Sequence, residues 1–403
     1  MTNWQPYTFS DFVEINPTIS LKGKGTFSFI EMKDLYDGQR YVYPAQERTI
    51  TGGARFGEGD TLFARITPCL ENGKICQAKG LKNGVGFGST EFLVFREREN
   101  VSDTNFIYYL SRWEEVRRYA ELHLVGTSGR QRVPKDIFDK LELTLPDLET
   151  QKKIAEILSA LDYKIELNRR MNQTLEQMAQ TLFQQYFVNN IDNLSDGWRF
   201  GKIGEILEVK GGTTPSTKQR EFWDGEFHWT SPKDLSGLRF PVLLDTEKKL
   251  TPQGLKKVSS GLLPIGTLLL SSRAPIGYLA ITQIAVAINQ GYIAILCNKG
   301  YSNLFMLNWL KENMNIIIQN ANGSTFLEIS KSVFKNIDLK IPPVELVNKF
   351  DNLVRPLFEK IVLNEKENIK LTEIRDSLLP KLMSGEIDVM QTKAEELYEP
   401  VPS

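Results

Sequence analysis

The sequence predicts an α+β fold in which two pseudo-two-fold-related globular α/β domains are joined by two long helices that form an antiparallel coiled coil. Three observations lead to this prediction. Much of the first half recurs in the second, each half mixes short apolar-alternating runs with Gly, Pro and Asn turns, and each half ends in a long segment with almost no glycine. Alternating runs indicate strands, and long segments rich in Leu, Ile, Glu, Lys and Gln indicate helices. A length of 403 residues suits two or three domains.

An internal repeat covers nearly the whole chain. The pattern at residues 4–15 returns 194 residues later, and a gapless overlay of residues 135–183 on residues 331–379 gives 14 identities in 49 positions. Between these anchors the halves diverge, although residues 59–68 still resemble residues 266–275. The repeat favours two copies of one module that bind two different targets. Simple drift after an old duplication is the alternative.

The predicted division of the chain has five parts. A first domain at 1–146 is followed by a first spacer helix at 147–190, a second domain at 191–342, a second spacer helix at 343–386 and a C-terminal tail at 387–403. Within the domains we expect strands at 92–95, 141–145 and 292–296, and helices around 105–118 and 302–315.

Both long segments carry a seam whose residues follow alternating steps of four and three, the spacing of a coiled coil. The seams begin at Ile154 and Phe350, and Pro356 predicts an interruption of the second helix. Matching positions of the two seams hold asparagines, namely Asn168, Asn172, Asn364 and Asn368. In an antiparallel pair these amides meet near the middle, and a slipped register leaves them unpartnered at about 1–3 kcal/mol each. We expect them to fix the helix register; exposed positions at the seam edge are the alternative.

Composition and missing motifs exclude several classes of protein. The net charge is −1, only three Cys occur, and no stretch is apolar enough to span a bilayer. The first residues show no secretion signal, which predicts a soluble intracellular protein. The two His lack counterparts in the repeat, and there is no phosphate-binding loop, amino-methyltransferase motif or metal-ligand spacing. We therefore expect a chain without catalytic, metal-binding or cofactor-binding residues.

Charge by region indicates where nucleic acid could bind. Residues 1–146 carry 19 basic and 19 acidic residues, whereas residues 192–342 carry 17 and 13. The glycine turn at 127–132 combines two Arg, a Gln and two hydroxyls, groups that can contact base edges and phosphates. A solvated surface without a ligand is the alternative for each cluster. The candidate DNA contacts are Arg65, Ser89, Thr90, Ser128, Arg130, Gln131, Arg132, Thr214, Lys218, Lys233, Arg273, Asn289, Gln290, Ser324 and Thr325.

Three segments resemble a known family. Residues 145–168 (LPDLETQKKIAEILSALDYKIELN) closely resemble the central conserved region of the specificity subunits of Type I restriction–modification systems. Residues 378–387 (LLPKLMSGEI) resemble the end of that family's second helix, and residues 221–235 (EFWDGEFHWTSPKDL) resemble a motif of its target recognition domains. The chain departs at Glu345-Leu-Val347, where the family usually has a Glu-Gln pair, and at Glu149-Thr-Gln151. We interpret both departures as variation at helix starts.

The resemblance implies a non-catalytic reader of double-stranded DNA in the cytoplasm of a bacterium or archaeon. Each target recognition domain would read one half of a split sequence, and the helices would dock two modification subunits that bind S-adenosylmethionine and methylate adenine N6. Restriction subunits with motor activity, which use ATP and magnesium, could join the same complex. Three alternatives stay open: the specificity partner of a fused restriction–modification enzyme, a coiled-coil scaffold that binds protein without DNA, and a stand-alone DNA-modifying enzyme.

Overall fold

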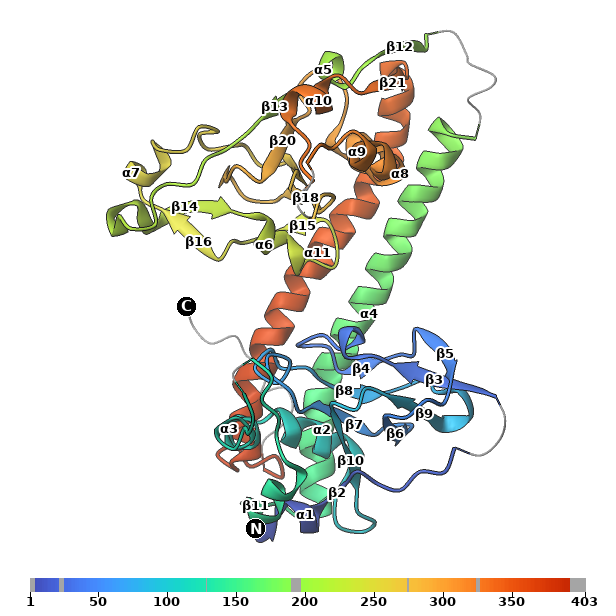
Figure 1. Ribbon diagram of the computed structural model, residues 1–403, viewed down its shortest axis with the longest axis vertical. Helices are drawn as coiled ribbons and strands as arrows, with labels where there is room; N and C mark the ends of the chain where they lie inside the picture. Colours follow the sequence, from blue (N-terminus) through green and yellow to red (C-terminus); the bar gives the residue numbers. More distant parts are fainter. Residues whose placement is uncertain are drawn as a thin grey trace. The chain divides into compact units, whose positions relative to one another are not determined.

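The computed structural model of the chain describes residues 4–21, 25–127, 129–189, 197–273, 275–323 and 327–391 (Figure 1). The chain divides into two compact units. Unit 1 combines the chain up to Leu167 with the chain from Glu367 onward, and unit 2 runs from Asn168 to Lys366. Each of the two long helices, α4 (Leu148–Phe187) and α11 (Val344–Met383), therefore contributes one half to each unit.

Unit 1 is built on a five-stranded sheet. Its order is β2 (Val13–Ile15), β10 (Phe92–Glu97), β7 (Thr61–Ala64), β8 (Ile75–Ala78) and β4 (Tyr41–Val42). A four-stranded sheet has the order β5 (Gln46–Thr49), β3 (Thr26–Ile30), β9 (Val85–Gly88) and β6 (Ala54–Gly57), and β1 (Gln5–Thr8) pairs with β11 (Glu142–Leu145). The helices are α1 (Phe9–Phe12), α2 (Thr104–Arg112) and α3 (Glu114–Leu122), with 3-10 turns η1 (Met32–Asp34), η2 (Lys82–Gly84) and η3 (Lys135–Lys140).

Unit 2 repeats this plan. Its five-stranded sheet has the order β13 (Glu208–Lys210), β20 (Tyr292–Leu296), β17 (Leu268–Ser271), β18 (Leu279–Thr282) and β15 (Val242–Leu243). A three-stranded sheet contains β16 (Lys248–Leu250), β14 (Trp223–Thr230) and β19 (Val286–Ile288), and β12 (Arg199–Lys202) pairs with β21 (Asp338–Ile341). The helices are α5 (Ile203–Ile206), α6 (Pro232–Ser236), α7 (Pro252–Leu255), α8 (Asn303–Glu312), α9 (Met314–Gln319) and α10 (Lys331–Lys335), with the 3-10 turn η4 (Arg220–Phe222).

The five-stranded sheets agree in strand order and in direction. In each, the first three pairings are antiparallel, and the last strand, β4 or β15, pairs parallel with its neighbour. Matching helices also begin with matching caps: the Asp103 carboxylate accepts backbone N–H bonds at the start of α2, and the Ser302 hydroxyl does so at the start of α8. The internal duplication predicted from the sequence is confirmed, as is the α+β fold class.

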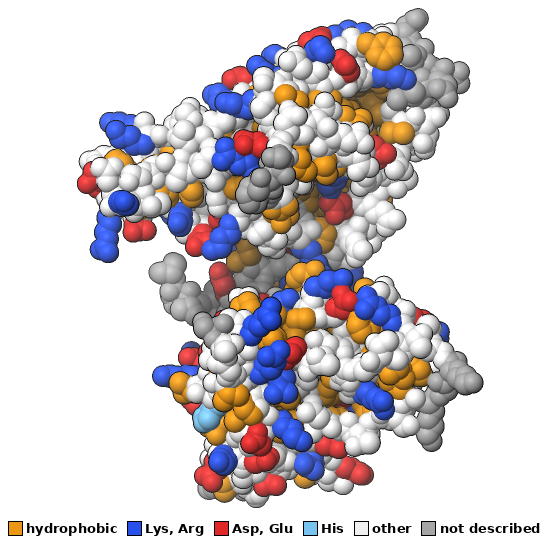
Figure 2. All heavy atoms as spheres, viewed as in Figure 1, with side chains coloured by type: hydrophobic (Ala, Val, Ile, Leu, Met, Phe, Trp, Pro, Cys, Tyr) orange, Lys and Arg blue, Asp and Glu red, His pale blue; other side chains and the backbone are white. Residues whose placement is uncertain are grey.

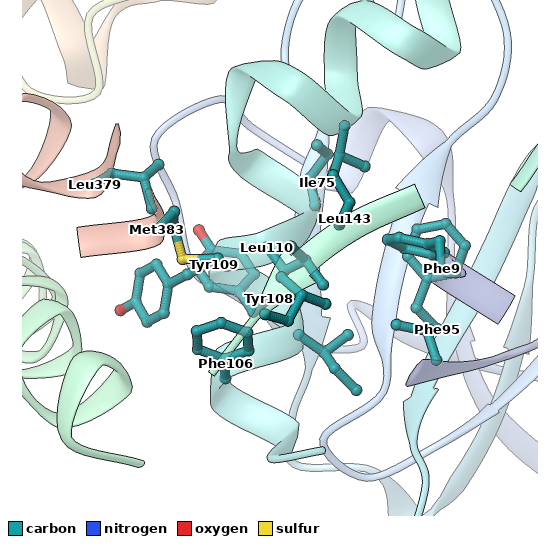
Figure 3. Close-up of a cluster of buried hydrophobic side chains, with 14 of the residues drawn as sticks. Phe9, Ile75, Phe95, Phe106, Tyr108, Tyr109, Leu110, Leu143, Leu379 and Met383 are labelled. Carbon is teal, nitrogen blue, oxygen red and sulfur yellow. The ribbon is translucent and has the colours of Figure 1, made fainter. Parts of the chain in front are cut away.

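The core of unit 1 joins its sheet domain to the long helices. Phe106, Tyr108 and Tyr109 of α2 lie beside Leu379 and Met383 of α11 in one buried cluster (Figure 3). Ile154 and Leu158 of α4 belong to the same cluster. The corresponding cluster of unit 2 unites α8 with Phe183 of α4 and Phe350 of α11. In both units the buried face of each long helix packs on the sheet domain of that unit as well as on the other helix.

The long helices follow the predicted seam. Every seam residue from Ile154 to Leu182 and from Phe350 to Leu378 is buried or half-buried. In unit 1, Lys164 follows Asp162 along α4, but its partner Glu367 precedes Arg375, the partner of Asp162, along α11. The two helix halves are therefore antiparallel there. Pro356 does not end the second helix, which continues to Met383, so the predicted interruption is wrong.

The strand predicted at 292–296 is β20 with the same ends, and the strands predicted at 92–95 and 141–145 are β10 and β11 with slightly different ends. The helix expected around 105–118 is divided into α2 and α3 because Trp113 has extended backbone angles, and the helix expected around 302–315 is divided at Asn313. The finer five-part division of the chain stays a prediction. None of the helices in the described part of the chain combines the length and the apolar character needed to cross a membrane.

Candidate nucleic-acid interface

Two equivalent turns hold four of the predicted residues. One turn links β9 to β10 and the other links β19 to β20. Ser89 Oγ accepts a hydrogen bond from the backbone N of Glu91 at 3.1 Å, and Asn289 Oδ1 accepts one from the backbone N of Gly291 at 2.8 Å. These side chains are therefore used to close the turns. The next residue, Thr90 or Gln290, is exposed in each turn.

A polar hollow of about 460 Å³ lies against the first turn. Arg65 and Thr90 line it, together with Arg55, whose Nη1 donates to the Ile19 carbonyl at 3.2 Å. Among the described residues, Arg65 Nε is buried without a hydrogen-bond partner. Two guanidinium groups beside a hydroxyl form a concave donor surface, the chemistry that receives phosphate oxygens or the acceptor edge of guanine.

The loop from Val125 to Arg132 is anchored at its end. Val125 and Arg132 exchange backbone hydrogen bonds. The Thr67 backbone N–H donates to the Gln131 carbonyl, and the Gln131 backbone N–H donates to the Thr67 hydroxyl. The Arg132 guanidinium holds both oxygens of Glu91 at 2.8–3.0 Å, and these hydrogen bonds and the charge of Glu91 raise the pKa of Arg132. Arg130 is exposed near the loop tip, and Ser128 lies outside the described residues. Arg132 thus stabilises the loop, whereas Arg130 faces solvent.

The candidates of unit 2 divide in the same way. Thr214 Oγ1 donates to Gln290 Oε1 at 2.7 Å, so two predicted residues meet at the second turn. Lys218 is exposed. Lys233 pairs with Glu247 at 2.8 Å and Arg273 pairs with Glu328 at 3.0 Å. Ser324 and Thr325 lie outside the described residues.

The two loops share a backbone bridge but have different ion pairs. Arg132 forms a bridge with Ile66, and Glu328 forms the equivalent bridge with Arg273. Arg132 pairs with Glu91 of the turn between β9 and β10, whereas Glu328 pairs with its own bridge partner, Arg273. An ion pair therefore holds the loop in both units, but its partner comes from a different segment in each. The two surfaces therefore share a frame and differ in the groups that they present.

No single continuous basic patch dominates the face of the molecule seen in Figure 2. Lys and Arg side chains are interspersed with Asp and Glu over both units there. Attraction to phosphates must then come from local groups such as Arg55, Arg65 and Arg130 rather than from the net charge. Sequence reasoning missed Arg55 and Asn16, which also line the hollow. The Gly52-Gly53 pair before Arg55 was the available signal, because both glycines have positive φ and mark a tight turn.

The described residues contain no group of three or more His, Cys, Asp or Glu side chains that could hold a metal ion. The four seam asparagines are buried rather than exposed at the seam edge. In unit 2, Asn364 Nδ2 donates to Asn172 Oδ1 at 2.7 Å, and Asn172 Nδ2 donates to Glu365 Oε1 at 2.8 Å. Their function in setting the register stays a prediction, as do the DNA contacts.

Comparison with known proteins identifies the family. The model of the Type I restriction modification DNA specificity domain matches twice, at residues 1–177 and 195–373. The HindI specificity subunit of Haemophilus influenzae is 26% identical, with 96% of this chain and 100% of that protein covered. The MjaIX specificity subunit of Methanocaldococcus jannaschii is 33% identical over 47% of this chain and 44% of its own length.

A solved structure supports the fold. The S subunit of a Type I restriction–modification system from M. genitalium has a TM-score of 0.54 at 17% identity, with 95% of this chain and 96% of that chain covered. The relatives are specificity subunits, the non-catalytic component of these systems, so the prediction that this chain is not itself an enzyme is confirmed. The chain therefore belongs to the Type I restriction–modification DNA specificity family, as a specificity subunit with two copies of the domain.

Proposed function

We propose that the chain recognises a bipartite target in double-stranded DNA, with one half-site read by each unit. In this proposal the long helices dock two methyltransferase subunits, which methylate adenine N6, and restriction subunits with motor activity join the same assembly. The chain selects the DNA sequence and its partners act on it, in the cytoplasm of a bacterium or archaeon.

One observation carries this proposal: the two units present different side chains from the same turn. Ser89 and Asn289 close equivalent turns, and the exposed residues that follow are Thr90 in unit 1 and Gln290 in unit 2. A Gln can bond adenine through two edge atoms, whereas Thr offers a hydroxyl and a methyl group. To read two different half-sites, two copies of one domain need the same backbone structure but different side chains at the positions that contact DNA.

The proposal assigns all cofactors to partner subunits. The sequence has neither a phosphate-binding loop nor an amino-methyltransferase motif. S-adenosylmethionine would therefore be bound by the methyltransferase subunits, and ATP with Mg²⁺ by the restriction subunits. A specificity partner of a fused restriction–modification enzyme would use the same DNA-reading surfaces. A scaffold without DNA binding would not, and this difference can be measured.

A methylation map of host DNA, with and without the chain, tests the proposal. We expect one split motif, with two short halves and a fixed gap, to lose methylation when the chain is removed. T90A should then relax only one half of the motif and Q290A only the other, because each residue belongs to a different unit. K140A, a change of an exposed lysine on η3, is the control and should leave the motif unchanged. An unaltered methylation map without the chain would favour the scaffold.

A further inference from the structure

A buried ion pair joins the two long helices within unit 1. Arg375 Nη1 of α11 lies 2.7 Å from Asp162 Oδ1 of α4, and both side chains are 2% exposed. Tyr109 of α2, labelled in Figure 3, donates its hydroxyl to Asp162 Oδ2 at 2.6 Å. Arg375 Nη1 also donates to the Gly38 carbonyl at 3.3 Å, and Arg375 Nη2 lies 2.8 Å from Oδ1 of the half-exposed Asp376. The pair is thus enclosed by both helices and by the sheet domain of unit 1.

The charges of this pair depend on each other. Burial alone would lower the pKa of Arg375, but the negative charge of Asp162 leads the interactions that raise it, and the pKa is raised overall. Removing one member of a buried ion pair is strongly destabilising, because the other charge stays desolvated without compensation. Any helix pairing that separates Asp162 from Arg375 is therefore penalised.

The repeat has no such pair in unit 2. In the overlay by 196 residues, Phe358 takes the place of Asp162, and Ala179 takes the place of Arg375. Both residues belong to the apolar core of unit 2. The same junction between the helices is therefore charged in unit 1 and apolar in unit 2.

The other seam layers do not distinguish one helix from the other. Ile154, Leu158 and Leu161 of α4 correspond to Phe350, Val354 and Leu357 of α11, so an apolar residue replaces an apolar one in each layer. The asparagines are identical in the overlay, since Asn168 matches Asn364 and Asn172 matches Asn368. They can align the helices, but they would do so equally well for two copies of the same helix.

We propose that the Asp162–Arg375 pair selects helix partners: it makes α4 pair with α11 and prevents either helix from pairing with its own copy in a second chain. If α4 met a second α4 in the observed antiparallel register, Asp162 would face Ala179 and lose its cation. If α11 met a second α11, Arg375 would face Phe358, lose the buried Asp162 carboxylate and keep only the half-exposed Asp376 of its own helix. Loss of the buried Asp162–Arg375 contact disfavours self-pairing by about a hundredfold or more.

Co-expression of two full-length versions of the chain, with tags of different mass, tests this inference. Native mass spectrometry then measures the fraction of mixed dimers. We expect little mixed dimer for the natural pair and at least a tenfold increase for D162N/R375M. This double substitution removes both charges with little change in volume and keeps an acceptor for Tyr109. D162R/R375D, which reverses the charges, should return the mixed dimers to the background.

Two further variants make the outcome decisive. A179R/F358D places a second ion pair in unit 2, so that every charge also finds a partner when a helix pairs with its own copy. We expect it to increase the fraction of mixed dimers as well. If D162N/R375M does not fold, this variant alone tests the inference. K202M/D338N removes an exposed ion pair of unit 2, at 2.9 Å, with the same kinds of substitution and should stay at the background. Background levels in both D162N/R375M and A179R/F358D, with helix content intact, would overturn the inference.

Discussion

Arg130 and Arg132 of one loop have different surroundings, although nothing in the sequence distinguishes them. Arg132 is held by both oxygens of Glu91, whereas Arg130 is exposed and donates its backbone N–H to the Thr127 carbonyl. A guanidinium already paired with a carboxylate has fewer donors left for DNA. Of the two side chains, Arg130 is therefore the better candidate for a DNA contact.

We expect R130A to lower the affinity of the assembled complex for its target. If Arg130 reads a base, the loss is about 1–3 kcal/mol and one position of one half-site is relaxed. If it touches only a phosphate, binding weakens for all sequences, and the slope of the logarithm of the binding constant against the logarithm of the salt concentration becomes shallower by about one. Titrations at several salt concentrations distinguish these outcomes. Unchanged binding with the fold intact would remove the loop from the interface.

The sequence located the turns better than it located the hollow. Ser89 and Asn289 could be placed in turns because Ser and Asn favour turns between strands, whereas their contact with DNA stays a prediction. For Arg55 the Gly52-Gly53 pair signals only a turn, because the place of Arg55 beside Arg65 depends on the pairing of β6 with β9, which are far apart in the sequence. Nor could the sequence reveal that Glu91 forms an ion pair with Arg132, because the two residues are 41 positions apart.

At the scale of elements, the long helices were the most predictable part of the chain. Their seam period of four and three is sustained from Ile154 to Leu182 and from Phe350 to Leu378, so a single atypical residue does not hide the helical pattern. The short helices were less predictable. The breaks at Trp113 and Asn313 depend on how α2 and α8 pack on their sheets, which periodicity alone does not describe.

We expect N172A to destabilise the chain by about 1–3 kcal/mol, because Asn364 Nδ2 would lose its buried acceptor. N172L/N364L removes both polar groups and should be close to neutral or stabilising. Urea unfolding followed by circular dichroism measures both. N352A, a change of an exposed asparagine of α11, is the control and should stay within about 0.5 kcal/mol. A similar loss for N352A and N172A would show that the buried amides have no special function.

At the scale of the whole molecule, the duplication and the missing catalytic motifs predict a chain that reads DNA but does not modify it. We expect the purified chain, incubated with labelled S-adenosylmethionine and target DNA, to transfer no methyl group. Addition of the methyltransferase subunits should start the transfer. Turnover by the chain alone that survives further purification would instead indicate a stand-alone enzyme.

The last prediction concerns the gap between the half-sites, which we expect the two shared helices to set. Each helical residue rises about 1.5 Å and turns about 100° around the helix axis. A four-residue insertion therefore adds about 6 Å and leaves the following side chains on roughly the same side of the helix. Placed after Asn172 in α4, with a matching insertion before Asn364 in α11, it keeps the antiparallel partners together. One base pair is about 3.4 Å, so the mapped gap should lengthen by one or two base pairs.

The bases read in each half should not change, because they depend on the recognition domains, which the insertion leaves intact. The same four residues placed after Gln391, beyond both helices, are the control and should leave the gap as it was. An unchanged gap with altered half-site bases would mean that the helices do not set the spacing. The division of the chain into reading domains and spacing helices would then be wrong.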